Sequence, residues 1–230
     1  WTAERSLTDQ KMYQAWSNPG QTHVDLVLNE TNHYYFYHNY DNYKIAYNVW
    51  EATLQPSEFF DKLLEFDEVW VPSKWQRDCT VKQGYPADKI FVIPEGVDTE
   101  TFFPEKVNHP LTNGERFTFG LFGRWDYRKS TTEIVRAFLA EFSKEEPVDL
   151  ILSADNPWGH AADGCNTTEE RLAKYGFEDD RIKILHMPPR KEYVDLMKSV
   201  NVFVSCARSE GWNLPLIEAM ACGTPSIYSD

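Results

Sequence analysis

The stretch that decides the fold reads SEGWNLPLIEAMACGTP and covers residues 209–225. It follows an apolar run, residues 202–206, with the composition of a buried strand. Asn213 is a typical N-cap residue, a proline in the first turn is favoured, and Gly223 suits the position after the last turn. The stretch therefore predicts a loop and then a helix. A strand, a loop and a helix in this order place the loop at the carboxyl edge of a parallel sheet, where open α/β sheets bind ligands.

Two glutamates of this stretch are candidate functional residues. Glu210 lies in the predicted loop, and Glu218 lies one turn into the predicted helix. The backbone N–H groups of residues 211–214 would be directed into the crevice, as a site for an anion or a hydroxyl. Considered alone, the residues favour a structural interpretation, in which Glu218 interacts with the helix dipole and Glu210 is solvated. The alternative is that both carboxylates approach one ligand.

A second informative stretch reads GLFGRWDYRKS and covers residues 120–130. A strand ends at Gly123, a cationic loop follows, and Ser130 begins a capping box for the next helix. Arg124 and Lys129 flank this turn, which suits the two phosphates of a nucleotide diphosphate. By itself the pattern is more typical of solvated surface charge. It is neither a Walker A loop nor a GxGxxG fingerprint, so it supports neither an NTPase nor a dehydrogenase.

Short apolar runs alternate with helical patterns along the rest of the chain. The runs lie at residues 24–28, 45–49, 68–71, 90–93, 117–122, 149–152, 182–185, 202–204 and 226–228. Helices are predicted after the caps Ser57 and Ser73, from Ser130, and over residues 189–200. This alternation predicts an α/β protein with parallel sheets covered on both faces. Residues 106–115 have the composition of a linker, which divides the chain into an N-terminal domain, 1–105, and a C-terminal domain, 116–230.

The composition is that of an ordinary globular protein. Of 230 residues, 42% are apolar and 26% charged, and 23 basic against 36 acidic residues give a net charge of −13. The acidic balance weighs against a nucleic-acid partner, although a few placed cations suffice for a diphosphate. No apolar run reaches the ~18 residues of a transmembrane segment. Four distant cysteines without a CxxC motif predict a reduced, cytoplasmic setting.

Four motifs together resemble glycosyltransferase family 4. Glu210 and Glu218, with seven residues between them, look like the E-x7-E signature of that family. The Gly-Arg and Arg-Lys pairs within residues 123–129 resemble its donor-phosphate motif. In the first half of the chain, residues 66–73 and 93–98 match segments that such transferases carry before the interdomain linker.

The resemblance runs from about residue 44 to residue 230 and implies a GT-B fold. In that fold two Rossmann-like domains with parallel sheets face each other across a cleft; here we expect both domains to be incomplete. The implied reaction is sugar transfer with retention, from a UDP- or GDP-sugar to a carbohydrate, lipid or glycoside acceptor, without a metal or other cofactor. The alternatives are a sugar-nucleotide epimerase and a non-catalytic fragment that binds nucleotide sugars.

The resemblance also implies roles for individual residues. Arg124 and Lys129 would hold the diphosphate and neutralise charge on the leaving nucleotide. Glu218 would accept hydrogen bonds from the ribose, and Glu210 would be the catalytic residue beside the donor sugar. Glu51, after a strand of the first half, is the acceptor-side candidate. Further donor contacts are expected from Gly211, Trp212, Asn213 and Leu214, and, near the base, from Met187.

Overall fold

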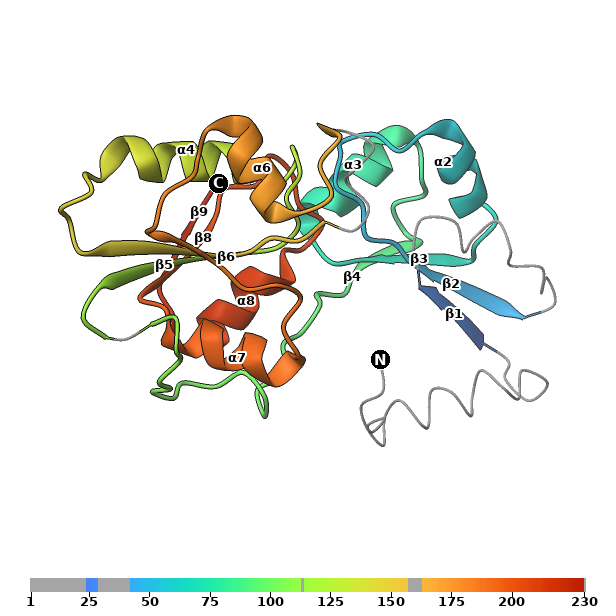
Figure 1. The fold of residues 1–230 in the computed structure, drawn as a ribbon. Coiled ribbons are helices and arrows are strands. Elements are labelled where there is room, and N and C mark those ends of the chain that lie inside the picture. The colour runs from blue at the N-terminus through green and yellow to red at the C-terminus, as the bar shows by residue number, and fades with distance from the viewer. Residues whose placement is uncertain (1–23, 29–41, 113, 157–162, 230) are drawn as a thin grey trace. The chain divides into compact units, whose positions relative to one another are not determined.

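The computed structural model describes residues 24–28, 42–112, 114–156 and 163–229 (Figure 1). The chain divides into two compact units, residues 1–94 and 95–230, and each is considered by itself. Each unit contains one sheet, and all strand pairs within both sheets are parallel. The predicted α/β class with parallel sheets is confirmed.

The first unit is a four-stranded sheet in which spatial order follows chain order. Its strands are β1 (Val24–Leu28), β2 (Tyr43–Tyr47), β3 (Glu68–Val71) and β4 (Ile90–Val92). Helix α2 (Ser57–Leu63) connects β2 to β3, and α3 (Lys74–Gln83) connects β3 to β4. Right-handed crossovers that all proceed in one direction place their helices on the same face, and Figure 1 shows α2 and α3 on one face. Phe60 and Leu63 of α2 pack there against Val69 and Val71 of β3.

The second unit is a five-stranded sheet in the order β7-β6-β5-β8-β9. Its strands are β5 (Phe117–Phe122), β6 (Val148–Ser153), β7 (Ile182–Ile184), β8 (Val202–Ser205) and β9 (Ser226–Tyr228). The first strand lies at the centre, and the chain returns from β7 across the sheet to place β8 on the other side of β5. The strand order reverses at this point, which is where Rossmann-like sheets open a crevice for ligands.

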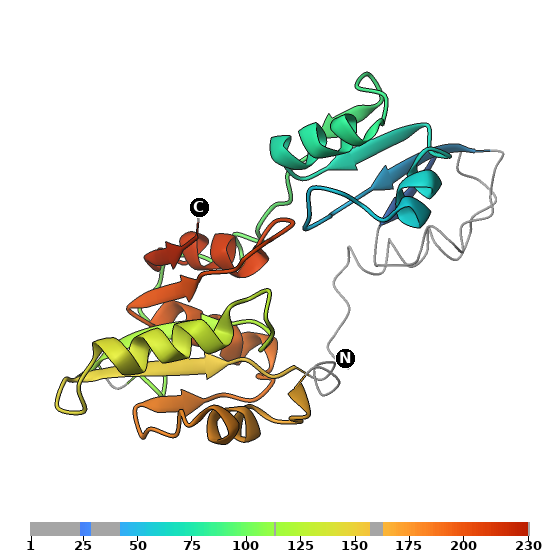
Figure 2. The same cartoon turned by 90° about the horizontal axis from the view of Figure 1, so that it is seen from above.

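Because the direction of the right-handed crossovers reverses, helices lie on both faces of the second sheet. Among the described residues, α4 (Thr131–Glu141) and α6 (Thr168–Tyr175) lie on one face. Helices α7 (Arg190–Ser199) and α8 (Leu214–Ala221) lie on the other. Seen from above in Figure 2, α4 lies in front of the sheet. Side chains alternate along each strand, so Leu121 packs in the core under α4 and α6, whereas Phe122 packs in the core under α7 and α8.

Residues 95–105 belong to the second unit, whereas the sequence places them in the first domain. Phe102 is only 1% exposed and is buried in the core formed with α7 and α8. A Cβ atom at Gly223, at the end of α8, would lie 3.4 Å from Pro104. The segment therefore packs on the second sheet's helices. The assignment of residues 106–115 as a linker stays a prediction.

Of the predicted N-terminal side-chain caps, the one at Ser73 is confirmed, and those at Ser130 and Asn213 are wrong. The hydroxyl of Ser73 accepts a hydrogen bond from the Gln76 amide at 3.1 Å, and α3 ends at Gly84, as expected. The capping box at Ser130 is wrong, because its φ of 53° is left-handed and its side chain makes no capping bond. Asn213, with φ of 66°, also does not cap its helix through the side chain.

Two other differences concern α2 and α6. Helix α2 begins at Ser57 itself, with Pro56 in the N-cap position and no side-chain cap. Helix α6 was not predicted, although its signal is present: the Thr167 hydroxyl accepts a hydrogen bond from the Glu170 amide at 3.1 Å. Among the described residues, no helix combines the length and apolarity that crossing a bilayer requires.

Candidate functional site

Two loops flank the point where the order of the second sheet reverses. Residues 123–130 follow β5, and residues 206–213 follow β8. They are tied together by main-chain and side-chain contacts. The Arg208 amide donates a hydrogen bond to the Arg128 carbonyl at 2.7 Å, and the Arg208 guanidinium lies 4.2 Å from the centre of the Tyr127 ring. These contacts hold the two loops together at the switch point.

These two loops carry a cluster of opposite charges. Arg128 Nη1 lies 2.9 Å from Glu210 Oε2, and Lys129 Nζ pairs with Glu210 Oε1. All three side chains are about one-fifth exposed, so solvent screens these pairs less than it screens a surface pair. Two cations thus converge on one carboxylate. This arrangement can accept an anion.

Arg124 is not part of that cluster. Its guanidinium is 48% exposed and lies 3.7 Å from the Asp126 carboxylate, on the same loop. The structure therefore brings Lys129 and Glu210 together, as sequence reasoning suggested, but the second cation beside them is Arg128. Arg128 was part of the quoted motif and was assigned no role of its own. Its adjacency to Lys129 was the available signal.

Backbone strain is concentrated at the same edge of the sheet. Within the described part of the chain, the non-glycine residues with positive φ are Ser130, Met187 and Asn213, at 53°, 30° and 66°. They lie in the loops after β5, β7 and β8, respectively. Such conformations cost of order 1–3 kcal/mol each, and they persist at binding sites, where the surroundings impose them. Their grouping makes this edge the candidate for a functional site.

The segment that leads from Glu210 into α8 has unsatisfied polar atoms. Asn213 donates a hydrogen bond from Nδ2 to Ser205 Oγ at 3.0 Å. Asn213 Oδ1 and Trp212 Nε1 are buried and lack a hydrogen-bond partner among the described residues. A buried polar atom without a partner costs about 1–3 kcal/mol. These two atoms therefore have unused hydrogen-bonding capacity beneath the loop surface, whereas neighbouring Leu214 is 46% exposed and Gly211 has no side chain to contribute.

Glu218 has a different environment from Glu210. It lies half-buried in α8, and its Oε2 accepts a hydrogen bond from the Tyr193 hydroxyl of α7 at 2.8 Å. Burial raises the pKa of Glu218, while the hydrogen bond from Tyr193 and the charge of Arg190 oppose that rise. Tyr193 was not predicted as a site residue, because its spacing with Leu196 and Val200 indicated only a core face.

Met187 lies in the loop after β7 and is 73% exposed. Its amide donates to Asp155 Oδ2 at 3.0 Å, and Asp155 also binds the His186 ring at 3.0 Å. The other ring nitrogen of His186 lies 2.7 Å from Glu169 Oε1. The hydrogen bond with Asp155, followed by that with Glu169, raises the pKa of His186. These contacts hold the exposed methionine at the edge of the sheet.

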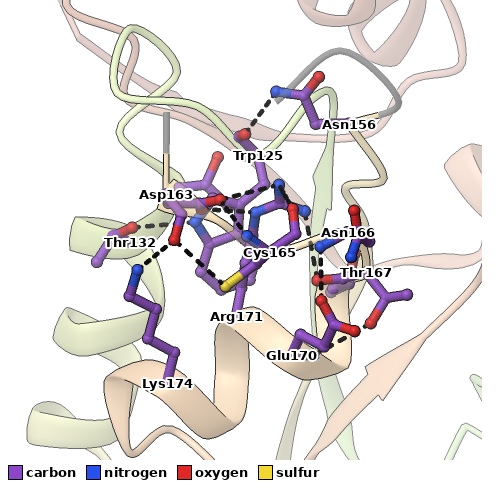
Figure 3. Close-up of polar contacts among 12 residues, drawn as sticks. Trp125, Thr132, Asn156, Asp163, Cys165, Asn166, Thr167, Glu170, Arg171 and Lys174 are labelled. Atoms are coloured by element: carbon purple, nitrogen blue, oxygen red, sulfur yellow. Dashed lines mark hydrogen bonds and ion pairs between the residues drawn. The ribbon is translucent and has the colours of Figure 1, made fainter. Parts of the chain in front are cut away.

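Residues 163–165, which precede α6, are held by a buried ion pair, which Figure 3 shows beside α6. The fully buried Arg171 of α6 binds Asp163 at 2.8 Å and the Cys165 carbonyl at 2.7 Å. Burial alone would raise the pKa of Asp163, but the hydrogen bonds from Arg171 and the Cys165 amide, together with the charges of Arg171 and Lys174, outweigh it and the pKa is lowered. Asn156 donates to the Trp125 carbonyl at 2.9 Å and so connects the segment after β6 to the loop after β5.

Two further expectations concern other parts of the chain. Glu51 follows β2 in the first unit and is half-buried, and its relation to the second unit is not described. Within the described ranges, no group of three or more His, Cys, Asp or Glu side chains could hold a metal ion. The candidate site is accordingly built from the second unit, around Glu210 and Glu218.

Comparisons with known proteins point to one family. A family model described as "Glycosyl transferases group 1" matches residues 116–230, half of the chain. The GDP-mannose:cellobiosyl-diphosphopolyprenol alpha-mannosyltransferase of Xanthomonas campestris is 25% identical over 182 residues, which are 79% of this chain and 44% of that protein. The chain thus spans less than half the length of this relative.

Solved structures agree on the fold. The sucrose-phosphate synthase of Thermosynechococcus elongatus is similar with a TM-score of 0.67 and 17% identity, over 96% of this chain and 60% of that one. Anabaena Alr3699/HepE, solved in complex with UDP and glucose, has a TM-score of 0.65 and 17% identity, over 81% of this chain and 53% of that one. The expected GT-B fold, with incomplete domains, is confirmed.

Proposed function

Because this chain belongs to the group 1 glycosyl transferase family, we propose that it carries the donor site of a retaining, metal-independent glycosyltransferase. The enzyme would move a sugar from a nucleotide-diphosphate sugar to an acceptor. The observation that carries this proposal is the cluster of Arg128, Lys129 and Glu210 at the switch point of the second sheet. An epimerase or a non-catalytic fragment is not favoured, since two relatives are named mannosyltransferases.

The cation cluster would bind the diphosphate. In the structure Glu210 is the counter-charge of Lys129 and Arg128. A diphosphate carries more negative charge than one carboxylate, so it would take over both cations and release Glu210 toward the donor sugar. Fixed cations in a shielded site also stabilise the charge that develops on a leaving diphosphate. Exposed Arg124 would complete the phosphate site from the same loop.

The remaining donor contacts follow from the same edge of the sheet. Trp212 Nε1 and Asn213 Oδ1 would bind sugar hydroxyls, together with the amides of residues 211–214. Glu218 would accept hydrogen bonds from the ribose, and Met187 would contact the base. UDP and GDP are the two probes to use, since one structural neighbour holds UDP and a relative is named for GDP-mannose.

The acceptor side is the first unit, with Glu51 as the candidate residue. A carbohydrate, a lipid-linked sugar and a small glycoside all remain in the proposed class, because a relative is named for a diphosphopolyprenol and another for mannosylfructose phosphate. Release of nucleotide diphosphate that depends on an added acceptor would support transfer. Isomerisation of the nucleotide sugar without an acceptor would instead indicate an epimerase.

The test is a calorimetric titration of this chain with UDP and, separately, GDP. We expect one of them to bind, and Lys129→Ala to weaken that binding by more than ~1.5 kcal/mol, the scale of a charged hydrogen bond. Lys144→Ala is the matched control, since Lys144 is exposed between α4 and β6, at the opposite edge of the sheet. Binding should persist in excess EDTA. Equal affinities of the wild type and Lys129→Ala would refute the phosphate role.

A further inference from the structure

Tyr193 is held rigidly at the end of the candidate site. Its ring meets Phe102 edge-on, with centroids 6.4 Å apart and an interplanar angle of 83°, and Phe122 at 5.8 Å and 69°. Both phenylalanines are buried in the core under α7 and α8. Aromatic contacts on two sides fix the direction of the phenol. The hydroxyl therefore reaches Glu218 from a defined position, at 2.8 Å from Oε2.

The contact is asymmetric, and this determines what the carboxylate can do. Oε2 of Glu218 is engaged by Tyr193, whereas no hydrogen bond from the described residues is recorded for Oε1. The charged or titratable groups near this carboxylate are Tyr193 and Arg190 on α7 and Cys222 on α8. Tyr193 is the one that donates a hydrogen bond to it.

We propose that Tyr193 is a positioning residue for Glu218: its hydroxyl holds Oε2 and directs Oε1 toward a hydroxyl of the donor's ribose. This inference rests on the proposed function, in which Glu218 binds the nucleoside. The hydrogen bond also favours the ionised carboxylate in a half-buried setting, where burial raises the pKa of Glu218. An ionised, oriented carboxylate is the form that accepts hydrogen bonds from sugar hydroxyls.

The first measurement needs no nucleotide. The pKa of the Glu218 carboxyl is followed by its ¹³C shift, assigned with Glu218→Gln, in the wild type and in Tyr193→Phe. The phenylalanine keeps the ring contacts and removes only the donor, so we expect the pKa of Glu218 to rise. Tyr85→Phe is the control, because it deletes another buried hydroxyl, which bonds the Phe66 carbonyl at 3.3 Å in the first unit. An unchanged pKa of Glu218 in Tyr193→Phe would overturn the inference.

The second measurement is the affinity for UDP or GDP as a function of pH. Tyr193→Phe should weaken binding about tenfold, the loss of one hydrogen bond to a charged group, and should move the acidic limb of the profile to higher pH. Glu218→Asp keeps the charge but withdraws the carboxylate from Tyr193, and it should act similarly if Tyr193→Phe does not fold. Wild-type affinity and profile in both variants would contradict the positioning role. Failure of the wild type to bind either nucleotide would refute the proposed function. The carboxyl titration would still show whether the Tyr193 hydroxyl controls the pKa of Glu218.

Discussion

The two sheets of this chain contain parallel strands of similar length, yet among the described residues the candidate site lies on the second sheet. In the first unit, strands β1 to β4 follow one another in one direction. In the second unit, the order reverses between β5 and β8, and the helices that follow these strands, α4 and α8, lie on opposite faces of the sheet. The charged cluster around Glu210 lies at that reversal. Topology, rather than strand composition, locates the site.

Backbone conformation also differs between the two units, and the unusual conformations lie in the unit that carries the candidate site. Among the described residues, positive φ at non-glycine positions occurs only in the second unit, at the three loops named above. In the first unit, the described segments after β2, β3 and β4 contain no non-glycine residue with positive φ, and helix α3 begins with a conventional serine cap. Strain that is retained at one edge of one sheet indicates that those loops are shaped for a ligand.

The largest expected effect comes from breaking the anchor of the second sheet's loops. Asp163→Ala removes the counter-charge of Arg171, whose side chain is fully buried. A buried charge without its partner destabilises a protein by about 3–5 kcal/mol, which urea unfolding should show. Adding Arg171→Met removes the stranded charge and should recover part of the loss. A cost below ~1 kcal/mol for Asp163→Ala would mean that the loops do not depend on this pair.

Most of the fold was predictable from sequence because apolar runs and turn residues report local structure directly. All nine predicted strands occur within one or two residues of their expected positions. The unit boundary was not predictable in the same way: residues 95–105 lack strand or helix periodicity, and Phe102 shows its role only when α7 and α8 are folded against it. The capping errors at Ser130 and Asn213 have one cause, since a capping residue type does not reveal a left-handed backbone.

The site was predictable in part. Motif spacing assigned Lys129 and Glu210 to one donor, which stays a prediction; the structure places the two side chains in contact because both follow strands that become neighbours. Motif spacing did not select Arg128 over Arg124 as the second cation, since that depends on the path of a short loop. Tyr193 could not be distinguished from a core residue by periodicity, because its ring is in the core and only its hydroxyl reaches Glu218.

A smaller effect is expected at the corresponding anchor of the first sheet. Gln76 of α3 is 1% exposed and donates to the Asn48 carbonyl, after β2, at 2.6 Å. This anchor is neutral, and Gln76 Oε1 already lacks a described partner. Gln76→Leu should therefore cost only about 1 kcal/mol in urea unfolding and leave UDP and GDP affinities unchanged. If Gln76→Leu lowered the free energy of unfolding as much as Asp163→Ala does, the proposed difference between the anchors of the two sheets would be wrong.

The smallest effect concerns pH and the loop that holds Met187. The pKa of His186 is raised, first by its hydrogen bond with Asp155. The protonated ring therefore stabilises the loop fully at pH values below the unfolded-state pKa of ~6.5. This stabilisation is lost as the pH rises through the folded-state pKa. Because His186 is 52% exposed, the change should be local. After correction for intrinsic exchange, hydrogen-exchange protection of the Met187 amide, which donates to Asp155, should fall over this range. The Asn48 amide of the first unit, bonded to the Trp70 carbonyl at 2.8 Å, should not respond. The same pH profile for the Met187 amide in His186→Gln would show that the His186 ring does not control this loop. The hydrogen bond from Met187 to Asp155 would then be what orders it.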